Sequence, residues 1–494
     1  IYSTHRKSAW KLKSIYSILQ VLRPSEIELV RHYYKRKVNA EKKMRLTLLN
    51  LSLSNRGLDN SSMSIMLDKD ISSSAFSHLK RRLKTDMLNA LMWQESSKRF
   101  GEGFRAAEFE CSKKITQAYI LMLRGALKDG VELLNKAKDL ADKYELISHR
   151  VIMNQILRRT IHGIKNMREL TEINAQLQGD IRNLELLNSS EEISFSVAAP
   201  GFNKKLASDF NRNADILIQK LKENYRKSEL SNVGFWYLLA ASENSKFHED
   251  HDAGLKFGMD FLKLVTENDA IRSNSNIGGV SLTVATSLMN LHRFKEAEEQ
   301  LTLSVKKFRT GGMNELHSMD LLIKAQLATY GTYRSKNTIQ AGENHPQVIK
   351  NPMLIARWSF YKASREFLAS KFDDSYSTLN TNGDLMRRKD HLNIQSRILE
   401  VLQLIELQDI EWIDFKLETL RKFLARNRRL KTLRIDGILK VLYALQAKNY
   451  RYDKLNRSTL KIVDHLSSDE KKWSWDPMSY ELVRFDSWLG RKMG

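Results

Sequence analysis

The residues best suited to metal chemistry stand together at positions 248–252, where the sequence reads His-Glu-Asp-His-Asp. His248 and His251 are three residues apart beside carboxylates, and such a set can bind a divalent cation. Two histidines in a charged loop between helices are more typical of a solvated turn than of a complete ligand set. We therefore expect no metal at this position.

Nucleotide and thiol chemistry have even less support in the sequence. No Gly-x-x-x-x-Gly-Lys-Ser/Thr loop occurs, and Gly101-Glu102-Gly103 lacks the third glycine of a dinucleotide-binding loop. The single cysteine, Cys111, excludes an intramolecular disulfide and has no histidine nearby to act as its base. Because unpaired cysteines usually pack as small apolar residues, we expect a non-enzymatic protein without a cofactor.

Two tryptophans near the C-terminus suggest a different chemistry, the stacking of nucleic-acid bases. Trp473 and Trp475 flank Ser474 and follow Lys471 and Lys472. Aromatic side chains beside cations on an exposed face can stack bases. The alternative, which we favour, is that both pack inside the last helices, since a repeat array needs an atypical final unit.

Basic residues are concentrated in residues 1–100, which hold 20 Lys and Arg against 8 Asp and Glu. Helices are predicted at Ser25 to Lys37, Ala40 to Leu53 and Ile71 to Met92. The third has an apolar stripe formed by Phe76, Leu79, Leu83, Met87 and Leu91. The basic residues that fall mainly off this stripe are Lys80, Arg81, Arg82 and Lys84. Three short helices, the last of them basic, resemble the outline of a helix-turn-helix domain.

A second basic region covers residues 416–472, with 16 Lys and Arg against 6 Asp and Glu. Its central cluster consists of Arg421, Lys422, Arg426, Arg428, Arg429, Lys431 and Arg434. The rest of the chain is almost neutral, although the net charge of the whole is +23. A surface that is basic only for solubility would not be divided in this way. Both regions are therefore candidates for contact with nucleic acid or with an acidic protein.

Composition and periodicity predict an all-α protein. Hydrophobic residues make up 42% and charged residues 28%, while only 5 Pro and 21 Gly occur in 494 residues, so long helices with short polar loops are expected. Breaks are predicted at residues 54–64, 189–201 and 340–352. The apolar stretches are too short to span a bilayer. The first residues show no apolar signal core, and we expect a cytoplasmic location.

Internal similarity predicts how the helices are arranged. One copy of the pattern places small, aromatic, small, large and small residues at Ala285, Phe294, Ala297, Leu301 and Ser304. The same offsets recur at Ala118, Leu127, Gly130, Leu134 and Ala137, and again at Ala363, Phe372, Ser375 and Leu379. Small residues at this spacing allow two antiparallel helices to approach closely, and the large residues fill the gap between successive pairs.

This spacing resembles the tetratricopeptide repeat. The resemblance implies antiparallel helix pairs stacked into a superhelix over residues 104–490, ending in atypical capping helices, with residues 1–100 as a separate basic helical segment. Further pairs are expected at residues 213–265 and 394–447. The copies are unevenly spaced and lack the proline that usually closes the repeat. The layout, with a C-terminal YELVRFDSWLGRKMG, also looks like uncharacterised bacterial tetratricopeptide-type proteins, for which no activity is implied.

The function expected from these features is binding of another macromolecule. The first hypothesis is a scaffold whose concave helical surface holds a protein or peptide, with the basic regions attracting an acidic partner. The second is a regulator that binds DNA or RNA through the basic N-terminal helices and uses the repeats as a sensor or oligomerisation platform. Fold resemblance alone does not decide between them, and the oligomeric state is left open.

Overall fold

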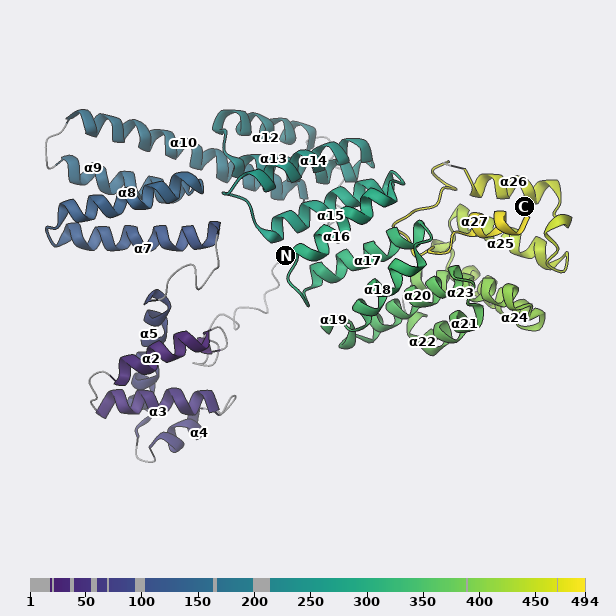
Figure 1. Cartoon of the computed structure of the whole chain (residues 1–494), viewed down its shortest axis with the longest axis horizontal. Coiled ribbons are helices and arrows are strands. Elements are labelled where there is room, and N and C mark those ends of the chain that lie inside the picture. Colours follow the sequence, from purple (N-terminus) through teal and green to yellow (C-terminus); the bar gives the residue numbers. More distant parts are fainter. Residues whose placement is uncertain are drawn as a thin grey trace. The chain divides into compact units, whose positions relative to one another are not determined.

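The computed structural model describes residues 18–19, 22–35, 40–54, 60–68, 71–93, 103–162, 167–198, 214–387, 390–468 and 470–493. All regular structure in these ranges is helical and none is β-strand, which confirms the all-α prediction (Figure 1). The chain divides into two compact units, residues 1–174 and 175–494, each described here by itself. None of the described helices is both long enough and apolar enough to cross a membrane.

The first unit begins with four helices around one core. They are α2 (Pro24–Lys35), α3 (Ala40–Ser54), α4 (Asn60–Leu67) and α5 (Ser73–Trp93). The predicted stripe of α5 is buried at Phe76, Leu79, Leu83 and Met87, while the side chain of Leu91 lies outside the described residues. The break predicted at 54–64 was partly wrong, because α4 begins within it. Met63 of α4 is buried, and the Ser52 hydroxyl of α3 lies 3.7 Å from its sulfur.

The same unit continues as a run of antiparallel helices that share a second core. These are α7 (Phe104–Leu123), α8 (Leu127–Lys143), α9 (Ile147–His162) and the start of α10 (Met167–Ala198). The break predicted at 189–201 was wrong over most of its length, since α10 continues to Ala198. A polar contact explains this: Ser190 is buried in α10 and its hydroxyl accepts a hydrogen bond of 3.0 Å from the Asn224 amide of a neighbouring helix.

The second unit is a longer helical array. It begins with the rest of α10, from residue 175. The α-helices that follow are α12 (Ala214–Ser228), α13 (Ser231–Phe247), α14 (His251–Glu267), α15 (Asn274–Asn290), α16 (Phe294–Lys307), α17 (Met313–Ala328), α18 (Thr332–Glu343), α19 (Pro346–Ile349), α20 (Pro352–Leu368), α21 (Phe372–Thr381), α22 (Gly383–Met386), α23 (Asp390–Leu407), α24 (Ile410–Arg426), α25 (Leu433–Gln446), α26 (Arg457–Leu466) and α27 (Phe485–Met493). The segments 213–265 and 394–447 each contain parts of three helices, so the pairs predicted there were wrong in number.

One connector geometry recurs at six helix junctions in the described part of the chain. After α7, α8, α13, α15, α17 and α20, three residues separate one helix from the next. The second residue of each connector has a positive φ, as at His292 and Ser370. The N–H of the third donates to a carbonyl in the last turn of the preceding helix, over 2.8–3.0 Å. This is the Schellman bond that closes a helix and reverses the chain. The repeated geometry produces successive antiparallel neighbours.

The small residues of the predicted pattern lie where these neighbours meet. Ala118, Ala285, Ala297 and Ala363 each have no exposed surface, as the pattern predicts for close helix crossings. Ser375 takes the same place in α21, and its hydroxyl donates 2.7 Å across the pair to the Ala363 carbonyl. Leu127 begins its helix, as Phe294 and Phe372 do, but it departs from these two half-buried residues in being 41% exposed.

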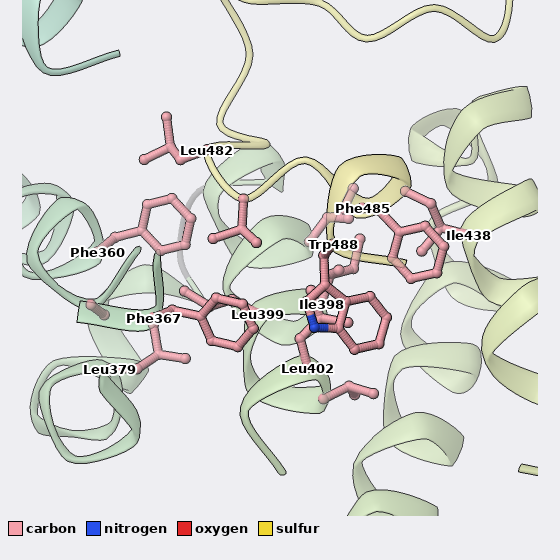
Figure 2. Close-up of a cluster of buried hydrophobic side chains, with 14 of the residues drawn as sticks. Phe360, Phe367, Leu379, Ile398, Leu399, Leu402, Ile438, Leu482, Phe485 and Trp488 are labelled. Atoms are coloured by element: carbon pink, nitrogen blue, oxygen red, sulfur yellow. The ribbon is translucent and has the colours of Figure 1, made fainter. Parts of the chain in front are cut away.

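The largest core of the second unit is closed by the end of the chain. Leu482, Phe485 and Trp488 point into a cluster that includes Phe360, Phe367, Leu399, Leu402 and Ile438 (Figure 2). Phe485 and Leu489 are fully buried, and Trp488 is almost so. The C-terminal segment, residues 470–493, is therefore part of the array's hydrophobic core.

Candidate partner-binding surfaces

The basic residues of α5 lie on its outer side but differ in their accessibility. Arg81 and Arg82 are exposed, whereas Lys80 and Lys84 are half-buried. Arg82 pairs with Glu41 of α3, and an Arg81 guanidinium nitrogen lies 3.3 Å from His78. Burial lowers the pKa of Lys80, whose ammonium lies 6.0 Å from the centre of the Phe76 ring. Arg81 and Arg82 are thus the more open of the four predicted contacts.

Three of the four helices of this segment are tied by a partly buried polar contact. Asp86 of α5 accepts hydrogen bonds from the Tyr34 hydroxyl over 2.7 Å and from the Arg45 guanidinium over 2.6 Å. Tyr34 belongs to α2 and Arg45 to α3, so a single carboxylate links three helices. This contact orients α5 and with it the outer residues Arg81 and Arg82.

The second predicted cluster lies on α24 and the turn that follows it. Arg421, Lys422, Arg426, Arg428, Arg429 and Lys431 are all exposed. Carboxylate partners are seen for Arg421, Lys422 and Lys431. Arg421 forms two hydrogen bonds with Glu418, of 2.6 and 2.7 Å, and Lys422 lies 3.6 Å from the same carboxylate. Lys431 lies 2.7 Å from Asp436. Six of the seven predicted residues are therefore exposed on α24 or in the turn that follows it.

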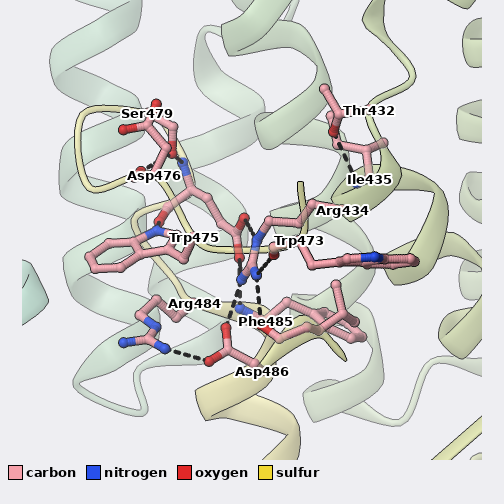
Figure 3. Close-up of polar contacts among 12 residues, drawn as sticks. Thr432, Arg434, Ile435, Trp473, Trp475, Asp476, Ser479, Arg484, Phe485 and Asp486 are labelled. Atoms are coloured by element: carbon pink, nitrogen blue, oxygen red, sulfur yellow. Dashed lines mark hydrogen bonds and ion pairs between the residues drawn. The ribbon is translucent and has the colours of Figure 1, made fainter. Parts of the chain in front are cut away.

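The seventh residue, Arg434, was wrongly predicted as a partner contact. It is only 7% exposed, and its guanidinium donates to both oxygens of Glu481 and to Asp486, each over 2.7 Å (Figure 3). It also donates 2.8 Å to the carbonyls of Leu466 and Trp473. Burial acts to lower the pKa of Arg434, but the two carboxylates outweigh it and raise that pKa. Arg434 holds the C-terminal segment to α25 and has no surface left for a partner.

Residues 478–488 of the C-terminal segment contact α17, α20 and α23. A scaffold would be expected to leave the surface of such helices open to a partner. The buried ammonium of Lys324 in α17 donates 2.7 Å to the Met478 carbonyl. Tyr480 stacks on Tyr361 of α20, with ring centres 6.5 Å apart. Glu406 of α23 accepts from the Trp488 indole over 2.7 Å. The surface shared by α17, α20 and α23 is therefore partly covered by the chain's own end.

The tryptophans proposed for base stacking belong to this covered region. Trp475 is 7% exposed, and its indole N–H donates 2.9 Å to the Glu481 carbonyl. Trp473 packs on the core, with its ring stacked 5.3 Å from that of His465. The packing interpretation of both residues is therefore the one that the structure supports.

The sequence analysis missed an exposed aromatic pair on α24. Trp412 is 51% and Phe415 is 60% exposed, and their rings meet edge to face with centres 5.7 Å apart. Lys416 lies 5.6 Å from the centre of the Trp412 ring while pairing with the buried Glu400 over 2.6 Å. A signal was present in the sequence: the buried stripe of Ile413, Leu417, Leu420 and Leu424 places 412 and 415 on other sides of the helix.

The sites weighed for chemistry form no reactive arrangement in the described residues. Asp250 caps α14 by accepting from the Ala253 N–H over 3.0 Å, and Glu249 pairs with Lys471. No group of three or more metal-ligand side chains occurs in the part of the chain described. Cys111 is fully buried, and burial raises the pKa of its thiol to about 11, so it is protonated near neutral pH.

Comparison with known proteins supplies no relative on which a function could be based. No protein-family model matches the chain, and no curated protein matches it. The functional argument therefore depends on the surfaces described above.

Proposed function

We propose that this protein is a non-enzymatic helical-repeat scaffold that binds an acidic protein partner through the outer face of α24. The helix pairs are proposed to form a tetratricopeptide-like superhelix that presents this face. The observation that carries the proposal is the exposed Trp412–Phe415 pair next to an exposed basic surface on the same helix. Exposed Trp and Arg side chains are the types most often found at the energetic centre of protein interfaces.

The geometry of α24 supports apolar anchoring at one end and charge recognition at the other. Trp412 and Phe415 lie in the first half of the helix, where Lys416 and Glu400 hold the position beside the Trp412 ring. Arg426, Arg428 and Arg429 are exposed at and beyond its C-terminal end. A fitting partner carries large apolar side chains followed by Asp or Glu residues. The apolar part would supply affinity, and the charges would mainly accelerate association.

Capture from a lysate of the native source tests this proposal. Full-length protein, the Trp412→Ala/Phe415→Ala variant and a control variant, Tyr333→Ala, are used as baits. Tyr333 is 81% exposed on α18 of the same unit, so the control removes an exposed ring elsewhere. We expect a polypeptide that both the parent and the control retain and that the α24 variant loses. Loss of two anchor residues should weaken binding by about 2 kcal/mol or more, roughly thirtyfold.

Retention of partner binding by the α24 variant would contradict the proposal. If the α24 variant recovers the same polypeptides as the parent in equal amounts, this face is not the binding surface. Nuclease treatment provides a further separation: a complex released by nuclease, and not by loss of the aromatic pair, belongs to the second candidate.

That second candidate is a nucleic-acid-binding regulator that uses α5, and the exposure of Arg81 and Arg82 favours it. Binding to duplex, single strand and RNA is titrated at several salt concentrations with the parent and with a variant in which Lys80, Arg81, Arg82 and Lys84 are Ala. Counterion release predicts a slope of ~0.9 per duplex phosphate contacted, which the variant should flatten. Absence of binding by the parent near physiological salt would eliminate this candidate.

A further inference from the structure

A pocket at the junction of α15, α16 and α17 is lined by cations and by no carboxylate. Its volume is about 590 Å³, within the usual range of small-ligand sites. The ten lining residues are Asn274, Ser275, Lys306, Lys307, Phe308, Arg309, Thr310, Gly312, Met313 and Asn314. We propose that this pocket binds a phosphate-bearing anion, a function separate from the contact surface on α24.

Three cationic side chains define the chemistry of the pocket. Lys306 and Arg309 are exposed, and the Lys307 ammonium is held 3.2 Å from the Asn274 side-chain oxygen. Lys306 and Lys307 end α16, where cations favourably meet the helix dipole. Arg309 lies two residues beyond the end of α16, so a favourable interaction with that helix dipole does not explain why a cation is present there. Three such donors around one space suit a multiply charged oxyanion, which accepts charge-assisted hydrogen bonds from each.

The starts of two long helices also line the pocket and add to its positive potential. Asn274 and Ser275 begin the 17-residue α15, while Met313 and Asn314 begin the 16-residue α17. The residue before α17, Gly312, offers no side-chain cap to its first turn. The Ser273 hydroxyl already caps α15 by accepting from the Asn276 N–H over 3.0 Å. Both helix starts carry a partial positive charge, which favours an anion that the cations have already attracted.

The carboxylate in the first turn of α17 does not neutralise the pocket. Glu315 accepts from the Gly311 N–H over 2.5 Å and lies 3.3 Å from His345, and it is not among the lining residues. A neighbouring junction of the array shows that basic residues are not needed for packing. Where α14 is followed by α15, the sequence has two carboxylates, Glu267 and Asp269, and a single cation, Arg272. The cationic lining is thus a property of this junction and not of the repeat.

Calorimetric titration of the full-length protein at low ionic strength tests the proposal. The probes are inorganic phosphate, inorganic pyrophosphate, O-phosphoserine amide and, as a non-phosphate anion, chloride. We expect saturable binding of one pyrophosphate per chain that weakens at least about tenfold in the Lys306→Gln/Arg309→Gln variant. The control, Lys336→Gln/Lys350→Gln, removes the same charge from exposed positions on α18 and after α19 and should bind as the parent does.

Each result decides for or against the pocket. No saturable binding of any phosphate probe, or an equal loss in both double variants, overturns the proposal. Tighter binding of O-phosphoserine amide than of pyrophosphate would identify the anion as part of a modified polypeptide, and the reverse order would identify a free polyphosphate. Circular dichroism and unfolding midpoints of the variants exclude loss of fold as the cause. Because the probes are small anions, failure of the α24 proposal leaves this test unaffected.

Discussion

Replacing Arg434 by Met should strongly destabilise the C-terminal part of the second unit. The guanidinium makes five hydrogen bonds of 2.7–2.8 Å, three of them to the carboxylates of Glu481 and Asp486. Both carboxyl side chains are at most 5% exposed. The Glu481 carboxylate then loses its cation, whereas Asp486 keeps Arg484 at 2.6 Å. A buried charge left without its partner costs about 3–5 kcal/mol. Met keeps most of the apolar volume, so the loss reports on the polar contacts.

The change should be local as well as large. Hydrogen exchange is expected to accelerate in α25 and α26, on which the C-terminal segment packs, and in α27, which belongs to that segment. The helices α12 to α15 should keep their protection. Urea unfolding followed by tryptophan fluorescence provides the free energy. Arg434→Lys should lose about half as much, since an ammonium keeps the charge but cannot form the two parallel bonds to Glu481.

A variant in which Glu481 and Asp486 are replaced by Gln and Asn supplies the control. In that background Arg434→Met should cost much less, because no buried carboxylate is left uncompensated. The reasoning is refuted if Arg434→Met changes the free energy of unfolding by less than about 1 kcal/mol. It is also refuted if the cost is the same in both backgrounds.

Three further predictions follow from burial. Ala297→Leu should lower stability by about 1–3 kcal/mol through overpacking at the α15–α16 crossing, and an unchanged urea midpoint would show that Ala297 is not in the seam. Gly342→Ala should also destabilise the fold, because the added Cβ would overlap the indole ring of the buried Trp358 at Nε1; a thermal midpoint equal to that of the parent would contradict this. Cys111 should resist thiol reagents in the native state. Burial raises the pKa of the Cys111 thiol to about 11, so the unfolded chain loses this proton at a lower pH than the native state does. The free energy of unfolding should therefore fall above pH ~9, by at most about 1.4 kcal/mol per pH unit. A Cys111→Ala variant with the same pH dependence would refute the assignment.

The exposed face of α24 shows how sequence periodicity can locate a surface without revealing its role. The buried stripe from Ile413 to Leu424 follows from spacing alone, and that stripe places Phe415 on the opposite side of the helix. Whether another element covers that side depends on where the rest of the array lies. The tryptophans illustrate this difference, since Trp475 is covered by the fold while Trp412 is not.

The sequence by itself determined the helical class and the crossings at Ala118, Ala285 and Ala297, because both follow from local periodicity and from side-chain size. Only the tertiary structure decided that Arg434 is buried. In the sequence it is one of several cations after α24, but in the fold it meets carboxylates 47 and 52 residues further along the chain. A cation whose partner is unknown is predicted to lie on the surface. The partners of Arg434 reach it only because the C-terminal segment packs back onto the array.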